Sequence, residues 1–71
     1  MSKIVDGRGL EPPQPFELTM EALADLKSGE SLTVLLDRMP YPLFRILDRD
    51  GYRHDAKVRD DGVVEISIVS P

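Results

Sequence analysis

The side chains that could do chemistry gather in two short stretches, each rich in proline. The first stretch carries two acids and a base, and the second carries an acid, a base and a phenol. In chain order these residues are Asp6, Arg8 and Glu11, then Asp37, Arg38 and Tyr41. Such groups bind a partner through ion pairs and hydrogen bonds. Neither stretch offers a nucleophile beside a base, so both predict binding and not catalysis.

Composition narrows the kinds of site that this chain can hold. The 71 residues contain no cysteine and one histidine, which excludes a disulfide and a thiolate zinc site. No metal cluster can be assembled from the remaining residues, so we expect no enzyme activity, no metal and no cofactor. Residues 1–71 should form one small domain, which buries only ~60% of the surface that its unfolded chain exposes. Oligomerisation would therefore add to the stability of the domain.

Charge and hydrophobicity indicate the class of partner. Nine basic and thirteen acidic residues give a net charge of −4, which argues against nucleic acid as the partner. No signal-peptide pattern opens the chain, and no apolar run approaches the ~20 residues that a membrane span needs. We therefore expect a cytoplasmic protein whose partner is another protein, with no membrane contact.

The first proline-rich stretch, residues 9–15, is here called the elbow. Pro12, Pro13 and Pro15 fix φ and remove backbone donors, so these residues cannot lie inside a strand or a helix interior. The elbow must join a strand at Lys3–Asp6 to a helix. A helix N-terminus attracts anions in principle, but two of these prolines delete donors there and Glu11 adds repulsion. The pattern therefore disfavours an anion site.

Apolar spacing places the elements around the two stretches. One helix is predicted over residues 16–27, ended by Gly29, because an apolar stripe recurs there at helical intervals. The stripe consists of Phe16, Met20, Leu23 and Lys27. Ser31–Leu36 is a nearly continuous apolar run, which is typical of an interior strand. Residues 37–42 form the second proline-rich connection.

The last third of the chain predicts a short helix and a hairpin. Leu43, Ile46 and Leu47 give a helical stripe, and Gly51 ends it so that Tyr52 folds back on the last turn. Two strands of period two follow, one over residues 52–58 and one beginning at residue 64. Pairing their apolar faces requires a three-residue turn, 60–62, with Gly62 left-handed and residue 58 opposite residue 64.

These elements define an α/β two-layer sandwich of order βαβαββ. We expect a four-stranded mixed sheet with both helices on one face, since no third helix remains to cover the second face. Parallel strands end on the same edge, so the elbow and the 37–42 connection should overhang one site. Its predicted residues are Asp6, Arg8, Glu11, Pro12, Pro13, Asp37, Arg38 and Tyr41. In the alternative interpretation, the aspartates cap turns, the arginines pair with them and the prolines only stiffen loops.

The elbow also carries a family resemblance. Residues 6–15, Asp-Gly-Arg-Gly-Leu-Glu-Pro-Pro-Gln-Pro, resemble the D-x-x-G-L-x-C-P-x-P signature of the TusA/SirA-like sulfur carriers. The matching positions are Asp6, Gly9, Leu10, Pro13 and Pro15. More narrowly, the chain is similar to a branch without cysteine. The resemblance implies the same fold with sheet order 1-2-4-3, and it places Pro12 where the carriers have their sulfur-bearing cysteine.

Two functions are compatible with a carrier fold that lacks its thiol. The first is a non-catalytic protein-interaction module that keeps the docking surface. The second is an accessory component of a sulfur-relay or redox system in which a partner supplies the thiol. Because a persulfide needs a cysteine, the chain itself should not carry sulfur.

Three further features have a structural and a functional interpretation. His54 is expected to be a partly buried packing residue, since a metal or acid–base role is difficult without a second histidine. Arg45 and Arg49 form a solvated helix face or a contact patch for an acidic partner. Phe44 either packs in the core or joins Tyr41 and Met39 in a small exposed apolar patch.

Overall fold

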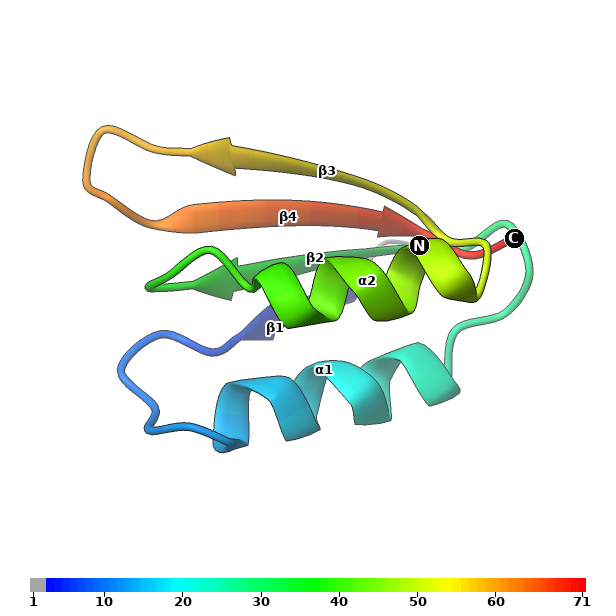
Figure 1. Cartoon of the computed structure of the whole chain (residues 1–71), viewed down its shortest axis with the longest axis horizontal. Helices are drawn as coiled ribbons and strands as arrows, with labels where there is room; N and C mark the ends of the chain where they lie inside the picture. The colour runs from blue at the N-terminus through cyan, green and yellow to red at the C-terminus, as the bar shows by residue number, and fades with distance from the viewer. Residues whose placement is uncertain (1–2) are drawn as a thin grey trace.

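The computed structural model describes residues 3–71, which form one four-stranded sheet and two helices (Figure 1). Along the chain these are β1 (Lys3–Asp6), α1 (Gln14–Ala24), β2 (Ser31–Leu36), α2 (Tyr41–Arg49), β3 (Arg53–Val58) and β4 (Val64–Val69). The predicted βαβαββ order is therefore confirmed. Within the described residues, neither helix has the length and apolar composition that spanning a bilayer requires.

The sheet is mixed, with strand order β1-β2-β4-β3. β1 runs parallel to β2, while β4 runs antiparallel to both β2 and β3. Val34 at the middle of β2 lies between Val5 of β1 and Ile66 of β4. The continuous apolar run of β2 thus belongs to an interior strand, as its composition predicted, and the order matches the one that the family resemblance implied.

Only one face of the sheet is covered, and both helices lie on it (Figure 1). The buried residues of the two central strands alternate and meet in cross-strand pairs. These pairs are Leu32 with Ile68, Val34 with Ile66 and Leu36 with Val64. Leu23 of α1 and Leu43 and Leu47 of α2 complete the same core. This arrangement is the predicted two-layer sandwich.

The β3–β4 hairpin has the predicted register. Val58 pairs with Val64, and the Arg59 N–H donates to the Val63 carbonyl at 2.9 Å. Gly62 has φ +86°, a left-handed conformation that glycine adopts without steric penalty. The three-residue turn keeps the apolar residues of both strands on the helix-covered face.

α2 ends at Arg49, just before Gly51, as the sequence predicted. Gly51 has φ +84°, its N–H donates to the Asp48 carbonyl at 3.3 Å, and the Tyr52 N–H donates to the Leu47 carbonyl at 2.9 Å. These two bonds are those of a Schellman ending. Tyr52 is half-buried and packs against the core. The chain therefore turns directly from α2 into β3.

The predicted bounds of α1 were wrong at both ends. The helix begins at Gln14, because Pro15 is tolerated in a first turn where its missing N–H has no partner in any case. It ends at Ala24, where the Asp25 N–H bonds back to Ala22 and the Leu26 N–H to Leu23. Gly29, with φ +82°, belongs to the connection that follows and does not end the helix.

Candidate functional site

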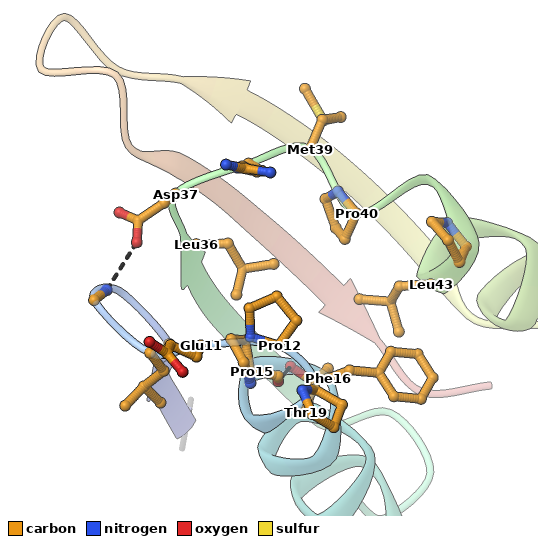
Figure 2. Close-up of a pocket in the computed structure, with 16 residues that line it drawn as sticks. Glu11, Pro12, Pro15, Phe16, Thr19, Leu36, Asp37, Met39, Pro40 and Leu43 are labelled. Carbon is orange, nitrogen blue, oxygen red and sulfur yellow. Dashed lines mark hydrogen bonds between the residues drawn. The ribbon is translucent and has the colours of Figure 1, made fainter.

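The elbow and the β2–α2 connection lie side by side at the edge where β1 and β2 end. Asp37 Oδ2 accepts a hydrogen bond of 2.7 Å from the Gly9 N–H, across 28 positions of the chain (Figure 2). The predicted juxtaposition of these two segments is confirmed. The bond joins the Asp37 side chain to the backbone of the elbow and so links the two segments.

A pocket of about 740 Å³, here called the elbow pocket, lies between these two segments (Figure 2). Its lining is mainly apolar and comes from the elbow, the first turn of α1, the end of β2 and the start of α2. The lining residues are Gly7, Gly9, Leu10, Glu11, Pro12, Pro13, Pro15, Phe16, Thr19, Leu36, Asp37, Arg38, Met39, Pro40, Pro42 and Leu43. This volume is within the range of protein sites that bind small ligands or single side chains.

Gly7 sets how closely the elbow approaches the sheet. It is buried directly after β1, and its N–H donates to the Leu35 carbonyl at 2.8 Å. A Cβ at this position would lie 2.8 Å from Leu36 Cδ2 and 3.2 Å from Pro15 Cβ. A larger residue at this position would displace the end of the Leu36 side chain and crowd Pro15, two residues that line the elbow pocket.

Thr19 forms part of the pocket and was not singled out by sequence. It is fully buried, and its hydroxyl donates to the Pro15 carbonyl at 2.8 Å. Among the residues that line the elbow pocket, it carries the only hydroxyl group. Since that hydroxyl is already bonded to the elbow, it is a structural group and not a nucleophile. In the sequence, the signal that could have predicted this contact is the i, i+4 helical spacing between Pro15 and Thr19.

Phe16 occupies a place that sequence spacing assigned wrongly. The apolar stripe put it in the core, yet the side chain is 40% exposed and lines the elbow pocket (Figure 2). Of the predicted stripe, Leu23 is buried and Met20 packs against the core, while the other buried position of α1 is Thr19. Because α1 begins at Gln14, Phe16 is in the first turn, where the helix faces the elbow and the β2–α2 connection.

Five of the eight predicted site residues line the elbow pocket, and three do not. The five are Glu11, Pro12, Pro13, Asp37 and Arg38. Asp6 and Arg8 pair with each other beside the pocket. Tyr41 is 67% exposed in the first turn of α2, and its ring meets Phe44 edge-on. The site residues that sequence missed are chiefly the apolar ones.

The Asp6–Arg8 pair is a local salt bridge. Arg8 Nε and Nη2 donate to the two carboxylate oxygens of Asp6, each at 2.8 Å, and the Arg8 N–H donates to Oδ1 at 3.1 Å. The guanidinium bonds, followed by the backbone bond, lower the pKa of Asp6 from 3.8 to about 2. For this pair, the turn-capping interpretation made from sequence is confirmed.

A pH titration checks this pair. Since the folded pKa of Asp6 is depressed, its contribution to stability is complete above the unfolded value and is lost as the pH falls through about 2. The carboxyl resonance of Asp6, followed by carbon NMR, should therefore titrate near pH 2. In Arg8→Ala the midpoint should rise, though not fully to 3.8, because the backbone bond remains. An unchanged midpoint in that variant would contradict the assigned cause.

Arg38 differs from Arg8 and Asp37 because its side chain has no partner within residues 3–71. The alternative interpretation of the sequence, in which Arg38 is a counter-ion for an aspartate, is therefore wrong. Asp6 is bonded to Arg8, and Asp37 accepts from Gly9. Within residues 3–71, the exposed Arg38 side chain makes no hydrogen bond or ion pair. The Glu11 carboxylate across the pocket is likewise unpaired among these residues.

A second polar cluster lies away from the elbow pocket, between α2 and β3. His54 Nε2 and Asp48 Oδ1 are 2.7 Å apart, and the His54 ring stacks on Phe44 with centroids 4.9 Å apart. The predicted role of His54 as a half-buried packing residue is confirmed. Phe44 packs against the core, which favours its structural interpretation. On the outer side of α2, Arg49 pairs with Asp50.

The chemistry open to the elbow pocket follows from these groups. Within residues 3–71, no cluster of potential metal ligands is found. The lining contains no histidine, and the sequence contains no cysteine. The pocket presents a mainly apolar surface together with the Arg38 guanidinium and the Glu11 carboxylate, neither of which has a side-chain partner in the described part of the chain. Such a surface can bind a partner by shape, apolar contact and charge.

Comparisons with known proteins agree with the resemblance seen in the elbow. Residues 4–70 match a family described as uncharacterized conserved protein, DUF2249. The chain is also similar to the crystal structure of a SirA-like protein from Desulfitobacterium hafniense, with 32% sequence identity and a TM-score of 0.82. That match covers 97% of this chain and 96% of the other. No curated protein matches the chain. The chain belongs to the DUF2249 family, and it has a SirA-like fold.

Proposed function

We propose that this protein is a non-catalytic interaction module that binds a partner protein at the elbow pocket. The observation that carries this proposal is a stiff, mainly apolar pocket that contains no reactive group of its own. The resemblance to sulfur carriers puts their reactive cysteine at Pro12, which lines this pocket. Loss of the thiol with retention of the surrounding surface supports a docking role.

The walls of the elbow pocket favour binding because they are ordered in advance. Pro12, Pro13 and Pro15 restrict one wall, and Pro40 and Pro42 restrict the other. The Asp37 bond to Gly9 joins the two walls. A partner therefore orders little backbone when it binds, and less of its interaction energy is lost to entropy.

A second function deserves a test because Pro12 lines the pocket. A partner that docks there could bring its own thiol to the place where a carrier would hold sulfur. The protein would then be an accessory component of a sulfur-relay or redox system, with the chemistry on the partner. In both functions we expect a cytoplasmic protein with no enzyme activity or cofactor of its own.

Affinity capture with matched variants tests the proposed function. The bait Arg38→Ala/Tyr41→Ala removes two exposed side chains near the pocket and should lose the wild-type partner with little change in melting temperature. The control bait, Arg45→Ala/Arg49→Ala, changes the outer face of α2 and should keep it. If the control loses the partner and the first bait keeps it, binding occurs on α2 and the proposal is wrong.

A sulfur-transfer assay tests the absence of carrier activity. Incubation with a cysteine desulfurase and labelled sulfur should leave the wild-type protein unlabelled, because no residue can form a persulfide. Pro12→Cys provides the matched variant, since it restores a thiol at the elbow. Stable labelling of the wild-type chain at any residue would contradict the prediction. Labelling of Pro12→Cys alone would favour the sulfur-relay function.

A further inference from the structure

The charges around the elbow pocket are of two kinds. The Asp6–Arg8 pair and Asp37 are satisfied within the protein. Two charged side chains have no side-chain partner within residues 3–71. They are Arg38, on the side of the pocket formed by the β2–α2 connection, and Glu11, on the side formed by the elbow. Arg38 is also the only basic residue among those that line the pocket. The pocket therefore presents one cation and one carboxylate without side-chain partners among these residues, beside a mainly apolar cavity.

We propose that the elbow pocket binds a protein segment in which an apolar side chain stands next to a single acidic residue. The apolar side chain enters the cavity, and the carboxylate pairs with Arg38. This inference rests on the proposed function, and it adds the chemistry by which the partner is recognised.

The guanidinium of Arg38 selects a carboxylate. Arginine presents a planar set of donors that matches the two oxygens of a carboxylate, and such charge-assisted bonds are stronger than neutral ones. The neighbouring Asp37 directs one carboxylate oxygen to the Gly9 N–H at 2.7 Å and forms no ion pair with Arg38. A partner carboxylate at this wall therefore meets a guanidinium that has no ion-pair partner within residues 3–71.

The remaining acids limit the partner to one negative charge at the site. Glu11 and Asp37 both line the pocket, so a second carboxylate next to the first would meet like charge. The chain as a whole carries a net charge of −4, which also repels a strongly acidic partner. These charges disfavour a polyanion, and an apolar segment with one acid fits the site better.

The cavity between the walls selects an apolar side chain. Leu36 and Leu43 belong to the core and also line the pocket, while Phe16, Leu10 and Met39 contribute further apolar surface. The volume of about 740 Å³ accommodates one or two large side chains of a short segment. A partner segment in which an apolar side chain stands next to an acid would therefore use both the apolar cavity and Arg38.

Three short peptides test this inference with the full chain. Each is acetylated and amidated, with the sequence Gly-Leu-Phe-X-Gly, where X is Asp, Asn or Lys. Backbone amide shifts should change at the elbow and at residues 36–43. We expect the Asp peptide to bind ~5-fold more tightly than the Asn peptide, as for a partly exposed ion pair, and the Lys peptide to bind most weakly.

Charge variants separate the role of Arg38 from a general effect. Arg38→Gln should abolish the preference for Asp over Asn, and Arg38→Glu should reverse it in favour of Lys. Arg53→Gln is the matched control, because Arg53 is also exposed and lies on β3, away from the pocket. It should keep the full preference for Asp.

Four outcomes would overturn the inference. They are equal binding of the three peptides, absence of binding by all of them, a preference for Asp that survives Arg38→Gln, and octanoate binding at the same residues more tightly than the Asp peptide. The last outcome would assign the pocket to a small amphipathic acid. If any of these occurs while the Arg38→Ala/Tyr41→Ala bait still loses its partner, the proposed function stands and only this inference fails.

Discussion

Replacing Phe16 with alanine is expected to weaken partner binding by about 30-fold or more, with little effect on folding. Phe16 is an aromatic side chain on the wall of the elbow pocket and is already 40% exposed in the free protein. Aromatic residues that become buried in an interface are often hot spots, which contribute about 2 kcal/mol or more, and that energy corresponds to this change in affinity. Titration calorimetry with the captured partner measures the loss.

Leu18→Ala is the control for this prediction. Leu18 is on the same helix and 39% exposed, but it lines a second, smaller depression that shares only Leu10 with the elbow pocket. Its replacement should leave the affinity for the partner within about twofold of the wild type, since surface changes outside an interface have small effects. Equal losses in the two variants would show that the partner does not use the elbow pocket specifically. Matching melting temperatures would show that both variants remain folded.

Leu43→Ala should destabilise the protein by about 2–5 kcal/mol. Leu43 is 1% exposed and belongs both to the core and to the lining of the elbow pocket. Its truncation removes buried apolar surface and leaves a cavity that the sheet cannot fill. A chain of this size has a total stability of about 4–10 kcal/mol, so the loss is a large share of the whole. Urea unfolding followed by circular dichroism measures it.

Two other substitutions in α2 serve as controls for the effect of Leu43→Ala on stability. Leu43→Met nearly conserves volume and should cost less than about 1.5 kcal/mol. Tyr41→Ala removes a side chain that is 67% exposed and should change stability only slightly. A loss below about 1 kcal/mol for Leu43→Ala would show that the pocket can collapse around the smaller side chain. The pocket would then be less rigid than the proline-rich walls indicate.

Much of the fold could be predicted from sequence because its signals act between near neighbours. The alternation of β3 and β4 favoured a three-residue turn with Gly62 left-handed, since a two-residue turn at residues 61–62 would place Val58 opposite Glu65. Gly51 ended α2 through hydrogen bonds that span only a few residues. The prolines of the elbow disfavoured a strand or a helix interior by their own geometry, although Pro15 is accepted in the first turn of α1. In each case the deciding interaction lies within one element or one turn.

The position of the site could also be predicted, but its polar contacts could not. Parallel strands β1 and β2 end on one edge, so the elbow and the β2–α2 connection had to approach each other. Sequence offered Arg8 and Arg38 as equal partners for Asp6 and Asp37. Only the three-dimensional arrangement shows that Arg8 forms a salt bridge with Asp6 and that the Gly9 N–H donates to Asp37. Arg38 has no partner within residues 3–71.

By itself, the sequence determined the order of elements, the register of the hairpin, the loss of the thiol and the edge where the site lies. The tertiary structure decided that Phe16 lines the pocket, that Thr19 is buried and that Asp37 holds the elbow at Gly9. Backbone preferences and periodicity report on neighbours along the chain. The surroundings of Phe16, at the start of α1, depend instead on the β2–α2 connection, which lies some 20 residues further along the chain. The pairing of β1 with β2 brings that connection beside α1.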